Sequence, residues 1–134
     1  MAFQIADVEA ELTQLLPALT GKPCSTRVPN PRPKIFVQVR RSGGIANFES
    51  GDRSDVFRDK PLIDIYVWGE DESTVADIMS QIRSFLFSAR HTQPFSTPVD
   101  RVVEFLGPTW FDDDLTGASR LWATYEIPTR IKEI

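Results

Sequence analysis

Hydrophobic residues recur at helical spacing in two segments of the chain. In residues 5–19 and again in residues 70–89, apolar side chains follow one another at steps of three and four, with charged and polar residues between them. Asp7 is a suitable N-cap, and Pro17 with Gly21 ends the first segment, while Asp71 and Glu72 suit the positive end of the second. We therefore expect two amphipathic helices. Their core-facing residues are predicted to be Ile5, Val8, Leu12, Leu15, Leu16 and Leu19, and Val75, Ile78, Met79, Ile82, Phe85 and Leu86.

Other segments alternate with a period of two, which is typical of strands. This pattern predicts strands over 35–40, 62–68, 99–106 and 119–127, with a short strand over 24–28. Gly107 and Pro108, followed by acidic residues, predict a turn between the last two long strands. Residues 45–60 follow neither period, so we expect a long loop at about 43–60.

The order of these elements predicts one α+β domain over residues 1–134. We expect a two-layer sandwich, with two helices packed on one face of a four- to five-stranded, mostly antiparallel sheet. The second face also carries large aromatic residues, which two helices cannot cover. Another subunit is therefore a candidate cover for Phe36, Tyr66, Trp68 and Trp122.

Composition and charge narrow the function classes. The 134 residues carry a net charge of −4, which argues against a chain that binds nucleic acid over its whole surface. The sequence has no apolar run of the roughly 20 residues that a membrane-spanning helix needs. The first residues lack the pattern of a secretory signal, and a single cysteine excludes an internal disulfide. We expect a protein that stays in the compartment where it is made and has no membrane partner.

Catalytic and metal sites find little support. Cys24 and His91 are single copies 67 positions apart, which disfavours a nucleophilic pair and a zinc site. The run Asp112–Asp114 with Gly117 begins like a calcium loop, but Ala123 stands where a closing glutamate belongs. The sharpest enzymatic alternative is a Mg²⁺-dependent nuclease that uses the strand carboxylates Asp64, Glu104 and Glu126.

A stiff basic segment separates the first two predicted strands. Three alternate prolines fix the backbone over residues 29–33, and basic residues lie in and beside them. Three interpretations stay open: charged residues that protect a sheet edge from uncontrolled pairing, an interface that binds carboxylates of a neighbour, or, as the third choice, a contact with phosphate. The basic residues are Arg27, Arg32, Lys34, Arg40 and Arg41.

The segment TRVPNPRPKIFVQVRRSGG, residues 26–44, resembles the early part of tail terminator proteins from long non-contractile-tailed bacteriophages. The order of elements agrees over nearly the whole chain. Asp59, Lys60 and Pro61 lead into a strand that ends at Trp68, and a final strand opens near Arg120. Many relatives run more directly from the glycine pair to the next strand than this chain does.

The resemblance implies a virion structural protein without enzymatic activity, cofactor or metal. Copies would form a ring, usually a hexamer, on the head-proximal end of the tail tube, after assembly in the cytoplasm of the bacterial host. The ring would bind the major tail tube protein, stop tube polymerisation and offer its other surface to a head-completion or connector protein, while DNA passes through the lumen without specific binding. The alternative is another head–tail connector or a tube-like structural protein.

This implied role suggests which residues make subunit or tube contacts. Arginines on a stiff loop lose little entropy on docking, and loop aromatics become buried on assembly. The interface candidates are Arg27, Arg32, Arg40, Arg41, Phe48, Phe57, Trp110 and Phe111.

Overall fold

The computed structural model describes residues 2–51, 54–112 and 119–133, and the side chains of 2–46, 57–111 and 119–132. Two helices form as the sequence predicts. α1 (Val8–Thr20) begins at Asp7, whose side chain accepts a hydrogen bond from the Ala10 backbone N–H, and ends at Gly21 in the left-handed conformation. α2 (Glu72–Thr92) is capped by Asp71 and ends at Gln93, which also has a positive φ of 50°. No helix in this described part of the chain is long and apolar enough to cross a membrane.

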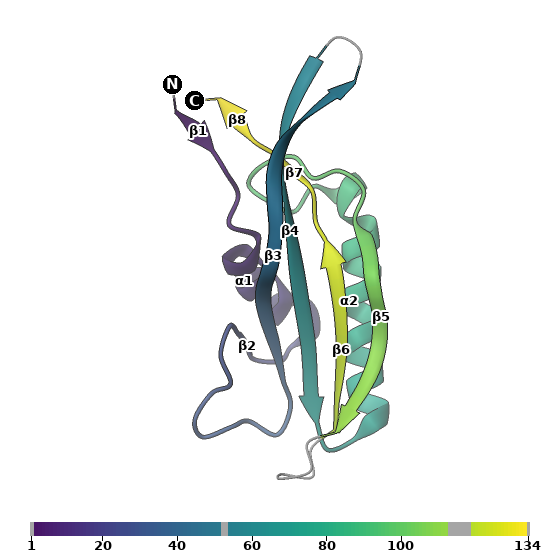
Figure 1. Ribbon diagram of the computed structural model, residues 1–134. Coiled ribbons are helices and arrows are strands. Elements are labelled where there is room, and N and C mark those ends of the chain that lie inside the picture. Colours follow the sequence, from purple (N-terminus) through teal and green to yellow (C-terminus); the bar gives the residue numbers. More distant parts are fainter. Residues whose placement is uncertain (1, 52–53, 113–118, 134) are drawn as a thin grey trace.

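The main sheet has the order β2-β3-β4-β6-β5, and β7 pairs with β4 at Arg58 and Asp59 (Figure 1). Its strands are β2 (Cys24–Ser25), β3 (Phe36–Gly51), β4 (Ser54–Gly69), β5 (Val103–Asp112), β6 (Ser119–Glu126) and β7 (Thr129–Arg130). β2 pairs with β3 in parallel, and the other pairs are antiparallel. Near the two termini, β1 (Phe3–Gln4) and β8 (Lys132–Glu133) form a separate two-stranded sheet.

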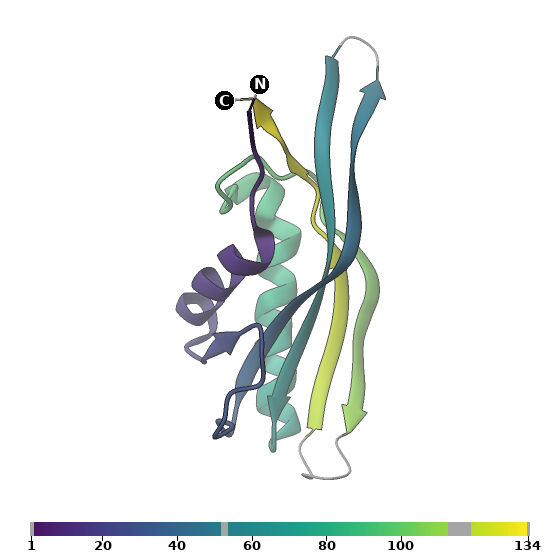
Figure 2. The same ribbon diagram turned by 60° about the vertical axis from the view of Figure 1, so that its left-hand side comes forward.

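Both helices cover the same face of the main sheet, as Figure 2 shows. The core lies between these layers, because Val37, Ile65 and Ala123 on neighbouring strands are fully buried together with Leu12 and Ile82 of the helices. The predicted α+β two-layer class is therefore confirmed. The other face of the sheet, here called the outer face, carries the alternate residues of each strand.

The predicted loop at about 43–60 is wrong. β3 and β4 are 16 residues each and form one long hairpin whose pairing runs from Phe36 opposite Trp68 to Gly51 opposite Ser54. β6 pairs with β4 only over Leu62–Gly69. The outer end of the hairpin, residues 47–51 and 54–57, therefore extends beyond the body of the sheet as an arm (Figures 1 and 2).

The glycine pair marks an irregularity in β3 instead of its end. The register shifts between Arg41 and Gly43, which is a β-bulge, and Gly44 has a φ of +94°. A Cβ atom at Gly44 would overlap the carbonyl oxygen of Lys60 and lie 2.8 Å from the backbone N of Leu62. Glycine is needed here because the two strands approach too closely for any side chain.

The predicted turn at Gly107 and Pro108 is also wrong, because both residues lie inside β5. β5 is the edge strand of the sheet, and its register with β6 shifts twice between Glu104 and Thr109. Proline and glycine are tolerated at such a position, since a bulged edge strand does not need every backbone hydrogen bond. β5 also starts later than predicted: Val99 forms only an isolated bridge to Thr129.

Candidate functional site

The Arg-Pro segment connects β2 to β3 at the end of the molecule opposite the arm (Figure 1). Arg27 and Arg40 are exposed there. The Thr26 carbonyl oxygen accepts hydrogen bonds from Arg40 Nη1 and Gln38 Nε2, both at 3.4 Å. These contacts attach the segment to β3 and leave Arg27 and Arg40 available to a neighbouring molecule.

Arg41 has a different environment. Its Nη1 and Nη2 donate to the two carboxylate oxygens of Asp59 at 3.1 Å each, and its Nε donates to the Gly43 carbonyl oxygen. The backbone N–H of Arg41 donates to Glu9 Oε2, which links β3 to α1. Asp59 is 4% exposed, so Arg41 neutralises a buried carboxylate inside the hairpin. The proposal that Arg41 also contacts a neighbour has to account for these internal bonds.

The aromatic residues of the outer face are partly covered within the chain itself. Phe36 is fully buried and Trp68 is 7% exposed, and their rings stack with centroids 5.4 Å apart. Tyr66 stacks on Trp122 with centroids 5.9 Å apart. The expectation that Phe36 and Trp68 need another subunit to cover them is therefore wrong.

Two arginines supply much of that cover. The Arg120 guanidinium lies 4.5 Å from the ring centroid of Trp68 and 4.2 Å from that of Phe111. Arg32 lies 5.6 Å from the Trp68 centroid on the Arg-Pro segment. Cation–π contacts of this kind hold a guanidinium in place while its edge stays able to donate hydrogen bonds. Arg32 is among the interface residues that the sequence predicts, whereas Arg120 is not, because its aromatic neighbours come from different strands.

The remaining aromatic candidates lie on β5 and in the arm. Trp110 and Phe111 are 42% and 48% exposed, and they face opposite sides of β5 because they pair with Leu121 and Arg120 respectively. Phe57 lies at the base of the arm, with its ring centroid 5.8 Å from that of Phe3. Phe48 pairs with Phe57 in the backbone register, and its side chain lies outside the described residues. The exposed rings of Trp110 and Phe111 fit the prediction of a contact surface, which no further observation tests.

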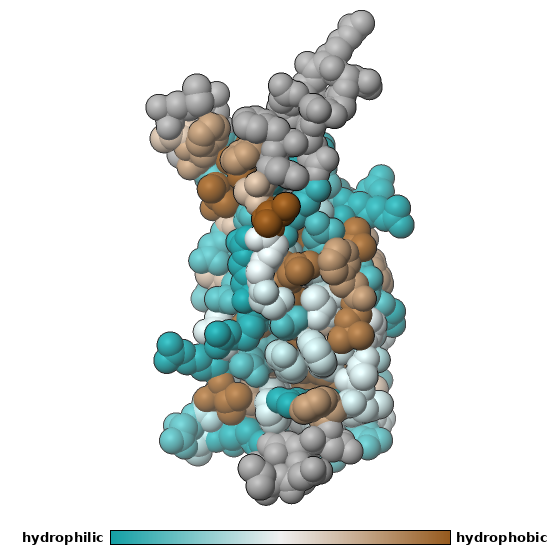
Figure 3. Space-filling view, in the orientation of Figure 1, coloured by the Kyte–Doolittle hydropathy of each residue, from teal (hydrophilic) through white to brown (hydrophobic). Residues whose placement is uncertain are grey.

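Figure 3 shows that the outer face mixes hydrophobic and hydrophilic surface and has no single continuous apolar patch. Exposed hydrophobic residues nevertheless lie along β5, where Val103 is 39% and Phe105 is 59% exposed. The opposite side of the sheet is also open beyond β2, because β2 pairs only with Val37 and Gln38 of β3. The sheet therefore has two free edges.

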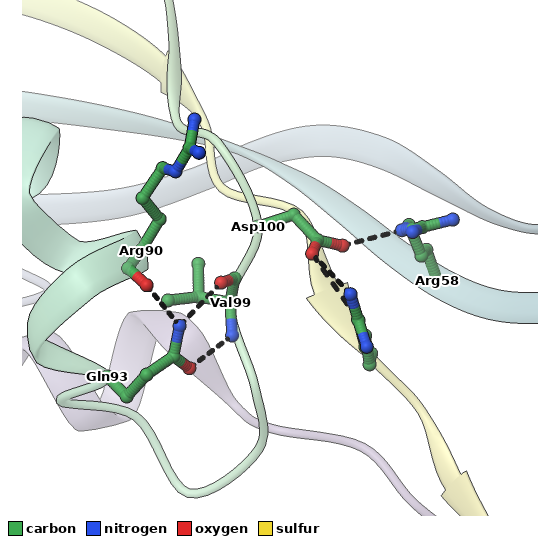
Figure 4. A network of polar contacts seen from close by, with 6 residues as sticks. Arg58, Arg90, Gln93, Val99 and Asp100 are labelled. Atoms are coloured by element: carbon green, nitrogen blue, oxygen red, sulfur yellow. Dashed lines mark hydrogen bonds and ion pairs between the residues drawn. The ribbon is translucent and has the colours of Figure 1, made fainter.

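A polar network lies where α2, β4 and β7 meet, and sequence reasoning missed it (Figure 4). Arg58 Nε donates to Asp100 Oδ2 at 2.6 Å, and Arg130 Nη2 donates to Oδ1 at 3.1 Å. Burial opposes ionisation of Asp100, but these hydrogen bonds outweigh it and hold the pKa of Asp100 below its ordinary value. Beside it, the Gln93 side chain donates to the carbonyl oxygens of Arg90 and Val99 and accepts from the Val99 N–H.

The three carboxylates of the nuclease alternative do not converge. Glu104 faces the helices, where Arg83 donates to both of its oxygens at 2.9 Å and Tyr125 donates to Oε2. Asp64 lies on the outer face and accepts a hydrogen bond from Thr124. Glu126 pairs with Leu62, which also lies on the outer face. The described part of the chain contains no group of three residues that could hold a metal ion.

The structure gives no support to the nucleophilic pair of Cys24 and His91 either. Burial raises the pKa of the Cys24 thiol to about 12, which leaves it a poor nucleophile. Cys24 in β2 and His91 at the end of α2 lie at opposite ends of the molecule (Figure 1). The acidic run Asp112–Asp114 with Gly117 lies outside the residues whose side chains are described.

Comparisons with known proteins give matches among solved structures and none among family models or curated proteins. No protein-family model matches the chain, and neither does any curated protein. Among solved structures, it is similar to a chain of the virion of a native gene transfer agent particle. The TM-score is 0.55 over 87% of this chain and 84% of that chain, with 13% sequence identity. At this identity the likeness establishes a shared fold.

Proposed function

We propose that this protein is a phage tail terminator, a structural component of the virion that acts by shape and not by catalysis. Copies form a ring, most simply a hexamer, on the head-proximal end of the tail tube. The ring prevents addition of further tube subunits and offers its other surface to the head-completion or connector protein. DNA passes through its lumen.

The fold likeness to a chain of a gene transfer agent virion is the observation that carries this proposal. It extends over most of both chains, so the two helices and the main sheet are compared together. The resemblance of residues 26–44 to tail terminators comes from sequence and is independent of it. The sequence resemblance and the fold likeness both support a component of a virion.

The surfaces of the chain support assembly into a ring. The sheet has one free edge at β5 and another along β3 beyond its contact with β2, and free edges are the places where another chain adds to a sheet. A pair of different edges on one molecule forms a head-to-tail interface, which closes into a ring when the rotation allows. The arginines of the Arg-Pro segment and the aromatics of β5 lie beside these two edges.

The arm supports contact with a neighbour. Isolated two-stranded hairpins are only marginally stable in water, and among the described residues the backbone of Ser54–Val56 is paired only with β3. A hairpin that extends beyond its own sheet gains partners when it lies against another subunit or against the tube.

A tube-growth assay tests the proposal. Purified tube protein is allowed to polymerise with and without this protein, and tube lengths and ends are imaged by negative-stain electron microscopy. We expect shorter tubes, each bearing one extra ring at a single end. Tubes that incorporate the protein along their length would identify a tube subunit instead. Tubes of unchanged length with no added ring would contradict the proposal.

Another head–tail connector is the second candidate, because the same fold likeness to a virion chain fits it equally well. A connector would bind the portal side of the junction and leave tube growth unchanged. The same assay, with a portal-side protein added in a parallel reaction, separates these two roles.

A further inference from the structure

A cavity beside the polar network has a surplus of positive charge. It has a volume of about 520 Å³, and its charged lining residues are one aspartate, Asp100, and four arginines, Arg58, Arg90, Arg101 and Arg130. Three positive charges are therefore left unbalanced in a chain whose net charge is −4. A concentration of arginines against the overall charge favours an anionic ligand.

Asp100 orients two of these arginines without using all of their donors. Arg58 donates to Asp100 through Nε alone, so its two terminal nitrogens stay free among the residues that the structure describes. Arg90 and Arg101 are exposed, and within the same described residues their side chains make no hydrogen bond or ion pair. A planar guanidinium with free terminal nitrogens binds a carboxylate or phosphate through two parallel hydrogen bonds.

The floor of the cavity is fixed in position before any ligand arrives. The Gln93 side chain makes two hydrogen bonds to the Val99 backbone and one to the Arg90 carbonyl oxygen, which tie the end of α2 to the loop at Val99, as Figure 4 shows. The backbone N–H groups of Asp100 and Arg130 donate to the carbonyl oxygens of Pro128 and Pro98. Because these bonds hold the loop after α2 against β7, little conformational entropy is lost on binding.

A second cavity of about 450 Å³ adjoins the first and shares Arg90 and Arg101 with it. Its lining adds Phe87 and Val103, which are 47% and 39% exposed, together with His91, Val102 and Glu104. The negative charge of Glu104 is balanced by Arg83, which donates to both of its carboxylate oxygens. A ligand that fills both cavities needs apolar groups next to its negative charges. A peptide with acidic and apolar side chains has both, whereas a nucleic acid backbone has no apolar side chains to place against Phe87 and Val103.

We propose that this pair of cavities binds an acidic segment of a partner protein, in which carboxylates alternate with apolar side chains. The partner is a different protein and not a second copy. In the part of this chain that the structure describes, the acidic and apolar residues that alternate over Val8–Leu12 are folded into α1 with Val8 and Leu12 buried, so they are not available to a second copy. The inference goes beyond ring formation, because none of the predicted interface arginines lines either cavity.

Binding of a fluorescein-labelled peptide that alternates glutamate with leucine, followed by fluorescence anisotropy, tests the proposal. The test variant is Arg90→Glu with Arg101→Glu, which leaves the Asp100 network intact. The matched control is Lys22→Glu with Lys34→Glu, which changes the net charge equally outside the cavities. We expect the unaltered protein and the control to bind the peptide, and the test variant to bind at least about tenfold more weakly. A peptide with glutamine in place of glutamate should not bind.

Several results would overturn the proposal. They are absence of peptide binding to the unaltered protein, equal binding by the test variant, and equal binding of the glutamine peptide. Inorganic phosphate or a duplex DNA that competes with the peptide more strongly than unlabelled peptide does would assign the cavities to a phosphate ligand instead. The test variant should still form the ring, so a failure of this inference leaves the tail terminator proposal standing, and the reverse also holds.

Discussion

Arg41 and Asp59 form the most buried ion pair of the described residues. The side chain of Asp59 is 5% exposed and that of Arg41 is 39% exposed, so solvent reaches mainly one partner. A charge that is almost fully buried depends on the hydrogen bonds that its partner supplies. We therefore assign Arg41 mainly to the stability of the hairpin and leave Arg27 and Arg40 as the freer arginines of the segment.

Replacement of Arg41 by alanine should lower the free energy of unfolding by about 2 kcal/mol, because Asp59 would lose two charge-assisted hydrogen bonds. Urea denaturation followed by circular dichroism, at a protein concentration that keeps the chain monomeric, measures the change. Arg90→Ala is the matched control, since Arg90 is exposed, and it should change stability by less than about 0.5 kcal/mol. An equal effect of the two substitutions would refute the assignment.

Glu104 gives the fold a dependence on acid pH. Burial alone would raise its pKa, but hydrogen bonds from Arg83 and Tyr125 outweigh that effect and hold the pKa below the usual 4.5. A carboxylate with a lowered pKa in the folded state stabilises the fold above its unfolded pKa, and the contribution is lost as pH falls through the folded pKa.

The urea midpoint should therefore fall between about pH 6 and pH 3, and Glu104→Gln should flatten this decrease. Glu70→Gln, at an exposed position, is the control and should leave the slope close to that of the unaltered protein. A Glu104→Gln variant with an unchanged slope would show that this cluster does not govern acid stability.

At the scale of elements, the helices were the easiest part to predict, because their signals are local. Asp7 caps α1 as expected, and Asp71 lies at the start of α2. The apolar steps identify the buried face except at Ile5 and Leu19, which were predicted to face the core and are 54% and 40% exposed because they lie at the ends of the helical pattern. The hairpin was missed for the opposite reason. Most residues of the arm pair only across the hairpin, and no layer of the described residues packs on either face of it. Neither face then has to be apolar, so the sequence of the arm shows no alternation of apolar and polar residues.

The candidate site, like the fold, could be predicted from the sequence only in part. The Arg-Pro segment stands out because prolines and arginines are adjacent in sequence. Arg58, Asp100 and Arg130 come from three distant segments, and only the pairing of β7 with β4 brings them together. A charge network of that kind has no sequence spacing by which to recognise it.

Gly44→Ala tests the close approach of β3 and β4. The substitution places a Cβ atom against the Lys60 backbone at a positive φ, so it should destabilise the fold by about 2 kcal/mol in urea denaturation. Gly43 also has a positive φ, of +136°, but a Cβ atom there meets nothing within 4 Å. Gly43→Ala should therefore cost less, about 1 kcal/mol. A larger effect at Gly43 would contradict the described register of the hairpin.

Shortening the arm tests its role as an assembly element. Replacement of residues 49–56 by an Asn-Gly turn retains Phe57, whose carbonyl oxygen accepts a hydrogen bond from the Ile131 N–H, and the pairing of Arg58 and Asp59 with β7. We expect circular dichroism of the monomer to stay close to that of the full chain, while capping of tube protein is lost. A shortened chain that caps tubes normally would show that the arm is dispensable for the proposed function.

At the scale of the whole molecule, the chain folds around one core between two helices and a sheet. Among the described residues, β5 has no strand beyond it at one edge, and β3 is paired with β2 over only two residues at the other. The aromatic residues of the outer face are covered by the chain's own arginines, which moves the expected contact surface from the face to the edges and the arm. A ring made by joining unlike edges would place every arm in an equivalent position. Under the proposed function, this symmetry would let a single small domain terminate a tube.

Native mass spectrometry of the purified protein, combined with negative-stain class averages of the same sample, tests the central claim most directly. The account predicts one closed oligomer of defined mass, most simply six copies, seen as rings with a central opening. A protein that stays monomeric at all concentrations, both alone and in the presence of tube ends, would contradict it.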